Sequence, residues 1–295
     1  MISVEINGKN YEFDKNSSLI QILKATDIKH QNRMVAAIVN NKVYNLNDTI
    51  TEDCKIKFIS REGVLGNRIY RRSLFLVLAK AIYQTYSNSF LSIEHSLSNG
   101  IYCELNNKTS LNQNDINTIE SKMNEIINNN YNIKKINVSK VKAIEIFEKQ
   151  NFLDKIELLK QTPDEQVTLY EIDGYYDYFY YNMVPKTGYL KKFKLHFSYP
   201  GFVLLFPQKN NPDQVPEFKE QPKLGKIFLE YEKLGKILGV ATVSELNEKI
   251  DNNKYGDLIR IAEGLHEKKI AQIADAIYDN IDQKKLILIA GPSSS

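Results

Sequence analysis

The chain has 295 residues, of which 42% are hydrophobic and 25% are charged, and its formal net charge is +3. This length predicts two or three domains with their own cores, and so small a positive excess does not demand a nucleic-acid partner. The sequence contains neither an apolar run of about 18 residues nor a secretory leader, so we expect no transmembrane helix and no membrane partner.

The two cysteines, Cys54 and Cys103, lie far apart in the sequence. This usage favours a reducing compartment over a disulfide scaffold, and we expect a cytoplasmic protein. Four histidines and two scattered cysteines are too few for a structural zinc site, so no metal is expected.

Residues 1–60 are predicted to form a small mixed α/β module. Alternating apolar residues in Ile2–Ile6 and the turn Asn7-Gly8 predict a β-hairpin. Ser17 or Ser18 can cap the helix that follows. Three later strands are predicted at Met34–Val39, from Val43-Tyr44, and at Lys55–Ile59.

This order of strands and helix is that of a β-grasp, ubiquitin-like fold, and it resembles the TGS domain of threonyl-tRNA synthetases, some GTPases and stringent-response enzymes. The sequence departs from that family at Asn16-Ser17-Ser18, where Thr-Pro usually precedes the helix. The resemblance implies a ligand-sensing or docking module without a catalytic site.

A polar break at Arg61–Gly63 precedes Arg68, Arg71 and Arg72. These three arginines could bind phosphate, or they could form the solvated first turn of a helix. Apolar residues at helical spacing predict a helix over Ser73–Tyr86.

Residues 61–207 as a whole are predicted to be an α+β domain, with helices between groups of antiparallel strands. We expect helices around Ile116–Ile126 and after Ser139, and strands at Phe90–Ile93, Ile101–Leu105, Val167–Ile172, Tyr175–Tyr181 and Phe193–Phe197.

This domain resembles the second additional, editing-type domain of threonyl- and alanyl-tRNA synthetases. The resemblance rests on Val77–Ala81, Glu94–Glu104, Thr168–Tyr170, Tyr176-Asp177 and Val184–Gly188. That family holds a metal or deacylates through His-x-x-x-His on the helix and Cys-x-x-x-His before the Val-Pro loop. Here the corresponding positions are Leu76, Lys80, Phe179 and Met183, so we expect neither zinc nor a histidine-dependent deacylase.

A cleft for a small ligand is the feature that the resemblance still implies. Its candidate residues are Lys80, His95, Cys103, Asp177 and Tyr180. The alternative is that the histidine and cysteine only pack and make ordinary hydrogen bonds.

Residues 208–283 are predicted to be a linker and a helical connector. The proline-rich stretch Pro207–Pro222 predicts a surface loop, and Thr242–Glu245 has the form of a capping box. Helical periodicity covers Ile227–Leu238, Tyr255–Leu265 and Ile270–Ile281. His266-Glu267 matches the first two positions of the metalloprotease motif His-Glu-x-x-His. Ile270 occupies the position of the second histidine, so this motif predicts no zinc site.

Residues 284–295 are predicted to be a strand followed by a partial P-loop, comprising Gly291, Pro292, Ser293, Ser294 and Ser295. We expect a larger α/β domain that is cut inside its phosphate-binding loop; the alternative is a serine-rich tail.

The order of these parts, with Arg71–Leu74 and Leu265–Ile270, resembles the TGS-containing branch of uridine kinase/phosphoribulokinase-like P-loop proteins. The resemblance implies that the full-length protein uses ATP and Mg²⁺ to phosphorylate a small molecule such as a nucleoside. This chain lacks the P-loop lysine and would then be a non-catalytic, regulatory or ligand-recognising part. The alternatives are an editing-dead, synthetase-derived RNA- or tRNA-binding module and a free-standing deacylase.

Overall fold

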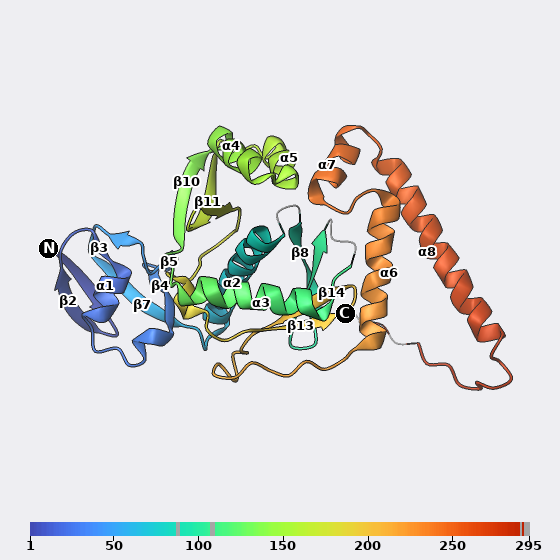
Figure 1. The fold of residues 1–295 in the computed structure, drawn as a ribbon, viewed down its shortest axis with the longest axis horizontal. Helices are drawn as coiled ribbons and strands as arrows, with labels where there is room; N and C mark the ends of the chain where they lie inside the picture. The colour runs from blue at the N-terminus through green and yellow to red at the C-terminus, as the bar shows by residue number, and fades with distance from the viewer. Residues whose placement is uncertain (87–88, 107–109, 290, 292–295) are drawn as a thin grey trace. The chain divides into compact units, whose positions relative to one another are not determined.

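The computed structural model describes residues 1–295 apart from 87–88, 107–109, 290 and 292–295. It divides into two compact units, Met1–Gly225 and Lys226–Ser295, which are treated separately below. Both the sheets and the helices of the predicted α+β class are present (Figure 1).

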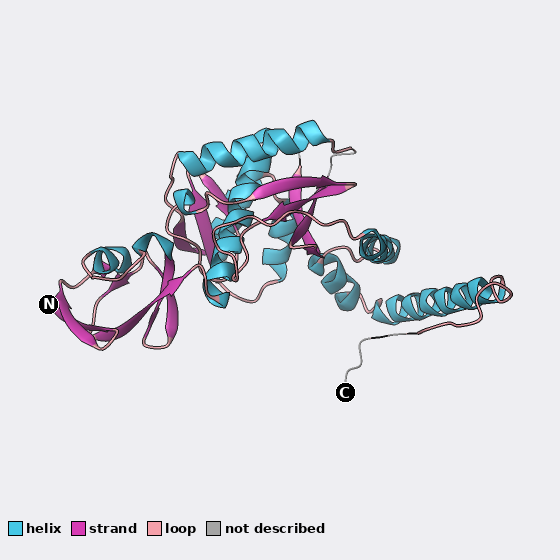
Figure 2. Cartoon of the chain, turned by 90° about the horizontal axis from the view of Figure 1, so that it is seen from below, coloured by secondary structure: helices cyan, strands magenta, loops and turns pink. Residues whose placement is uncertain are grey.

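The first module is a five-stranded sheet with the order β2-β1-β7-β4-β5, in which β1 and β7 run parallel. Figure 2 shows its helix on one side of the sheet. The elements are β1 (Ile2–Ile6), β2 (Lys9–Phe13), β3 (Ser17–Ser18), α1 (Leu19–Lys24), η1 (Gln31–Arg33), β4 (Met34–Val39), β5 (Lys42–Asn45), β6 (Thr49–Ile50) and β7 (Cys54–Ser60).

Local chemistry explains these elements. Asn7 and Gly8 both adopt positive φ, as a two-residue hairpin turn requires, and Asn40 and Asn41 do the same between β4 and β5. Ser18 accepts from the Gln21 backbone N–H in a capping box that starts α1. The hairpin, the helix cap and the strand β4 are therefore confirmed.

The second module contains a four-stranded antiparallel sheet, β13-β14-β9-β8, and a three-stranded one, β10-β11-β12. The elements are α2 (Val64–Thr85), β8 (Phe90–Leu97), β9 (Gly100–Asn106), α3 (Gln113–Asn128), β10 (Lys134–Ser139), α4 (Lys140–Gln150), α5 (Leu153–Gln161), β11 (Gln166–Ile172), β12 (Tyr175–Asp177), η2 (Thr187–Tyr189), β13 (Lys194–Ser198) and β14 (Gly201–Leu205). The predicted strand Tyr175–Tyr181 is confirmed only as far as Asp177.

Helix α2 begins at Val64, nine residues before the predicted start at Ser73, so Arg68, Arg71 and Arg72 lie within it. The early start is possible because Gly66 lets the helix approach the end of β7. A Cβ on Gly66 would lie 1.9 Å from the Ser60 carbonyl oxygen. The backbone contact, rather than apolar periodicity, determines where this helix starts.

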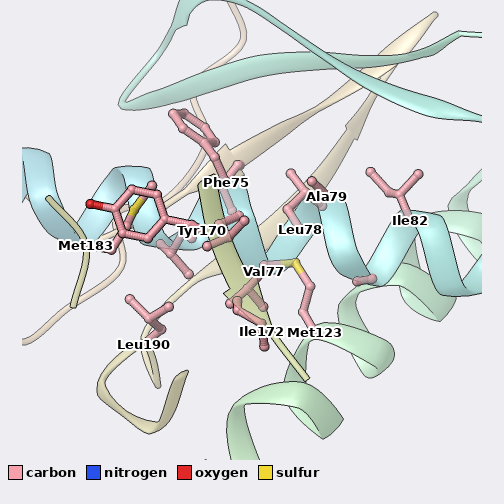
Figure 3. Packing of buried hydrophobic residues seen from close by; sticks show 14 of the residues in the cluster. Phe75, Val77, Leu78, Ala79, Ile82, Met123, Tyr170, Ile172, Met183 and Leu190 are labelled. Carbon is pink, nitrogen blue, oxygen red and sulfur yellow. The ribbon is translucent and has the colours of Figure 1, made fainter. Parts of the chain in front are cut away.

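Helix α2 packs on α3 and β8, and α3 packs on β13. Figure 3 shows Val77 of α2 beside Met123 of α3 and Ile172 of β11. Every residue of α2 from Ser73 to Ile82 is buried, and this burial at the centre of the second core explains the apolar composition of that stretch.

Two asparagine contacts, one buried and one partly exposed, join the first module to the second. Asn45 Oδ1 accepts from the Met183 backbone N–H at 3.1 Å, and Asn47 Nδ2 donates to the Pro185 carbonyl at 3.0 Å. These two hydrogen bonds hold the first module against the loop before η2.

The segment 207–221, predicted as a linker, lies against the outer face of the four-stranded sheet. Phe218 stacks on His196 with ring centroids 4.2 Å apart. The Ser98 backbone N–H donates to Gln221 Oε1, and Ser98 Oγ accepts from the Lys219 backbone N–H. This segment therefore belongs to the first compact unit.

The second unit contains the greater part of α6 (Pro222–Leu238), together with α7 (Val243–Asp251) and α8 (Tyr255–Tyr278). The capping box at Thr242 is confirmed, and one continuous helix, α8, runs through the two stretches of predicted helical periodicity and ends at Tyr278. Among the described residues, no helix is long and apolar enough to cross a membrane.

Residues 284–289 do not form the predicted strand. They have no regular secondary structure, and the side chains of Leu286, Leu288 and Ile289 are exposed. A strand needs a neighbour to take its backbone hydrogen bonds, and these residues pair with no strand that the structure describes. Gly291 is exposed, while Pro292, Ser293, Ser294 and Ser295 lie outside the described residues.

Candidate ligand-binding site

A pocket with a volume of about 210 Å³ lies between α2, β8, the start of α5 and β12. Most of its wall is aromatic or aliphatic. The lining residues are Ala79, Tyr83, Ser89, Phe90, Leu91, Ile93, Phe152, Asp154, Lys155, Tyr175, Asp177, Tyr178 and Phe179. An apolar cavity with a few charged groups is typical of a small-molecule site.

Three aromatic rings of this wall pack on one another. Tyr83, Phe152 and Tyr175 have centroids 5.4 to 6.1 Å apart in tilted or edge-on arrangements. Phe152 is brought there by Asn151, which ends α4 in the left-handed conformation and turns the chain toward α5. The fold thus presents a rigid aromatic surface to the cavity.

An ion pair between the partly exposed Lys155 and the buried Asp177 supplies the charge in this pocket. Lys155 Nζ donates to Asp177 Oδ1, which also accepts from the Tyr178 backbone N–H at 2.7 Å. The Tyr175 hydroxyl donates to Asp177 Oδ2 at 2.8 Å. Burial, with the Asp177 charge second, raises the pKa of Tyr175 well above its ordinary value, which keeps the phenol protonated.

Of the five predicted cleft residues, Asp177 lines this pocket and the others do not. His95 stacks on Tyr102 at 5.1 Å, and Cys103 is fully buried in the second core. Burial also raises the pKa of Cys103, so its thiol is protonated and unreactive. Tyr180 is 64% exposed, outside the pocket.

Lys80 is buried, and its ammonium group forms hydrogen bonds with backbone carbonyl groups. Nζ donates to the carbonyl oxygens of Ile172 and Asp173 at 2.9 and 3.0 Å, and lies 3.3 Å from Asp173 Oδ2. Burial lowers the pKa of Lys80, and the hydrogen bond and charge of Asp173 offset only part of this effect. These contacts hold the turn between β11 and β12 on α2.

The other three substituted positions carry apolar side chains. Leu76 and Met183 are almost wholly buried, and Phe179 lines the pocket. Within the part of the chain that the structure describes, no three His, Cys, Asp or Glu side chains come together in a way that could hold a metal ion. The pocket offers binding surface without a nucleophile from these positions.

Sequence reasoning did not identify Lys155 or the aromatic wall. Lys155 stands in α5, which was not predicted, and its partner Asp177 is 22 positions away. The tyrosine-rich run from Tyr175 was the one available signal, and it was interpreted as a strand.

A second cavity, of about 480 Å³, lies between α1 of the first module and the C-terminal end of α3. We call it the lysine groove. It is lined by Ile20, Lys24, Ile127, Asn128, Asn130, Lys186, Gly188, Tyr189 and Lys191. This lining contains three lysines and no carboxylate, although the whole chain has 39 basic and 36 acidic residues.

The floor of the lysine groove is fixed by close contacts. Thr187 Oγ1 donates to the Ile126 carbonyl at 2.9 Å, and a Cβ on Gly188 would lie 2.3 Å from Asn130 Oδ1. Lys186 and Lys191 flank this anchored turn, so their backbone is held on α3. Such an arrangement concentrates positive charge in a concave surface.

Comparison with curated proteins finds similarity to threonine–tRNA ligases. The chain is 31% identical to that of Clostridium kluyveri over 197 residues, which are 66% of this chain and 31% of the relative. It is 30% identical to that of Thermotoga maritima over 192 residues, 64% of this chain and 29% of the relative. It is 26% identical to the threonine–tRNA ligase of Caldanaerobacter subterraneus over 253 residues, which are 80% of this chain and 38% of the relative. No family model matches the chain.

These relatives correct the interpretation of the chain as part of a uridine or nucleoside kinase. They are consistently named threonine–tRNA ligase, so the kinase and phosphotransferase assignments are wrong. ATP and Mg²⁺, expected for the full-length protein, stay a prediction. The chain spans about a third of the length of these relatives and is similar to threonyl-tRNA synthetases over about two thirds of its own length.

Proposed function

We propose that this chain is a synthetase-derived tRNA-binding module that does not deacylate. The observation that carries the proposal is the match to threonine–tRNA ligases over 197 residues, combined with the side chains at the four editing positions. Lys80 is bound to backbone carbonyls, and Leu76, Phe179 and Met183 supply neither a proton acceptor nor a metal ligand.

In this proposal residues 1–60 are a TGS-like β-grasp domain and residues 61–207 an editing-like domain. The mixed sheet with β1 parallel to β7 supports the first assignment. Residues 208–283 then act as a connector, although 207–221 covers the four-stranded sheet.

The lysine groove supports RNA as the partner. Lys24, Lys186 and Lys191 form no ion pair with any other residue that the structure describes, so their charges are available to phosphates. Each phosphate contact releases counterions, which makes such binding weaken as salt rises. The aromatic pocket can at the same time hold a small group without cleaving it.

The test is binding of a threonine-accepting tRNA transcript to the whole chain across a salt titration. We expect binding that weakens with salt, and no deacylation of the mischarged tRNA. Replacing Lys24, Lys186 and Lys191 together by Gln should lower the slope of log K against log salt by about 2 to 3. The matched control replaces Lys9, Lys42 and Lys57, which are exposed on the first sheet. Absence of tRNA binding at low salt, or measurable deacylation, would overturn the proposal.

A further inference from the structure

Asp213 is a half-exposed carboxylate that pairs with three cations from three separate segments of the first compact unit. Its Oδ1 lies 2.8 Å from Arg61 Nη2 and 3.1 Å from Lys192 Nζ, and its Oδ2 lies 3.0 Å from Arg33 Nη2. Arg33 stands in η1, Arg61 follows β7, and Lys192 precedes β13. We call Arg33, Arg61 and Lys192 the cation triad.

The cation triad carries more charge than its partners neutralise. Among the described residues, Arg61 and Lys192 form ion pairs with Asp213 alone, and Arg33 also pairs with Glu62. Three positive charges therefore meet two carboxylates. Arg61 Nε is also a buried donor without a hydrogen-bond partner in the described part of the chain. Guanidinium groups bind carboxylates and phosphates in the same geometry, so a phosphate can take the place of the Asp213 carboxylate.

The turn that carries Asp213 is anchored at its two ends. At one end the Pro207 carbonyl accepts from Asn67 Nδ2 at 2.7 Å. At the other, Val215 and Phe218 pack on buried residues of the four-stranded sheet. Most residues between these anchors are exposed. Because few buried contacts hold the turn itself, Asp213 can leave the cation triad while the segment 207–221 stays on the sheet.

The cation triad continues the positive charge of the lysine groove. Lys191 lines the lysine groove, and Lys192 is the next residue in the chain. The Tyr70 hydroxyl fixes the Lys192 backbone, since it donates to the Lys192 carbonyl at 2.9 Å and accepts from the Lys192 N–H at 3.0 Å. An RNA strand with phosphates in the lysine groove can therefore bring a further phosphate to the cation triad.

We propose that the cation triad is a binding site for a phosphate of the RNA backbone, and that Asp213 occupies it as an internal anion until RNA displaces it. The displaced carboxylate returns readily to water, because Asp213 is already 50% exposed. This inference rests on the proposed function and adds two features to it. One is a second region of RNA contact, and the other is a contact within the chain that weakens RNA binding.

The experiment measures binding of the threonine-accepting tRNA transcript to the whole chain at near-physiological salt. Asp213→Asn should bind it about two- to fivefold more tightly than the wild type, the range expected when one exposed ion pair no longer competes. Such a gain in affinity cannot result from misfolding. The double variant Arg33→Gln/Lys192→Gln should bind more weakly and lower the slope of log K against log salt by about 0.7 to 0.9 for each phosphate lost.

The decisive comparison places Asp213→Asn in the background of Arg33→Gln/Lys192→Gln. Because the gain in affinity depends on the cation triad, it should disappear there. Glu145→Gln is the matched control, since Glu145 is 50% exposed, as Asp213 is, and pairs with Lys142 on α4. This control removes the same charge and should bind as the wild type does.

The inference is overturned if the wild type binds the transcript and Asp213→Asn binds it no more tightly, which would make Asp213 a clasp for the segment 207–221 and nothing more. An equal gain in the double-variant background, or with Glu145→Gln, would also overturn it. Inorganic phosphate at constant ionic strength should not remove the gain, and its removal would overturn RNA as the source of the phosphate. Failure of both the wild type and Asp213→Asn to bind the transcript would instead overturn the proposed function.

Discussion

Lys80 Nζ lies 2.9 Å from the carbonyl oxygen of Ile172, deep between α2 and the turn that joins β11 to β12. Lys80 is therefore a buried structural cation. Its three donors are used by Ile172 and Asp173, which leaves the side chain unavailable to a substrate.

Lys80→Met should therefore lower the free energy of unfolding by about 1.5–3 kcal/mol, because charged hydrogen bonds are lost while side-chain volume is kept. Urea denaturation measures the change. Lys160→Met is the control, since Lys160 is exposed and pairs only with Glu157 among the described residues, and it should change stability by less than about 0.5 kcal/mol. Equal effects of the two substitutions would contradict the structural role of Lys80.

Tyr70 predicts a loss of stability at alkaline pH. Its buried hydroxyl donates to the Lys192 carbonyl at 2.9 Å and accepts from the Lys192 N–H at 3.0 Å. Burial raises the pKa of Tyr70 to about 12, whereas the unfolded phenol ionises near its ordinary value of 10.0. The stabilisation is thus complete below pH 10 and is lost as pH rises toward 12.

The loss should amount to about 2–3 kcal/mol for a pKa raised by this much. In Tyr70→Phe, the free energy of unfolding should therefore fall by that much less between pH 10 and pH 12. The variant nevertheless starts from a lower stability at neutral pH. Chemical denaturation at a series of pH values separates the two effects. A slope that Tyr70→Phe leaves unchanged would show that other buried tyrosines account for the whole alkaline loss.

The sequence was sufficient for elements whose signals are local. The hairpin at Asn7-Gly8, the capping boxes at Ser18 and Thr242 and the strand Met34–Val39 all depend on neighbouring residues, and all were predicted. Helix α2 was predicted too short because its first turns are polar. Their helicity depends on the close approach of Gly66 to Ser60, which no periodicity reveals.

The candidate site was harder to predict because it is assembled from distant segments. Asp177 was identified through the Tyr-Asp sequence, but its partner Lys155 lies in an unpredicted helix. The three arginines were identified as a group with two alternative interpretations. Only the contact of Arg72 with Tyr181 distinguishes a cluster beside exposed aromatic rings from a solvated helical turn.

Two glycines in helices should respond in opposite directions to alanine. Gly66→Ala would place a methyl group 1.9 Å from the Ser60 carbonyl oxygen, so the helix or strand must shift, at a cost of about 1–3 kcal/mol. Gly264 of α8 has no described atom within 4 Å of its Cβ position, and Gly264→Ala should stabilise that helix by up to about 1 kcal/mol. Thermal unfolding of each unit's helices, followed by circular dichroism, measures both. Equal shifts in the two variants would contradict the close contact at Gly66.

The ion pair in the aromatic pocket should show strong coupling. Lys155→Met leaves the buried Asp177 carboxylate without its cation, which is expected to cost about 3–5 kcal/mol. Asp177→Asn should cost less than this, because Lys155 is 24% exposed and can turn toward water. In the double variant, the neutral amide that replaces the carboxylate leaves no buried charge, so part of the stability should return.

A double-mutant cycle by urea denaturation gives the coupling energy directly. A coupling energy near zero would show that Lys155 and Asp177 act independently in the pocket.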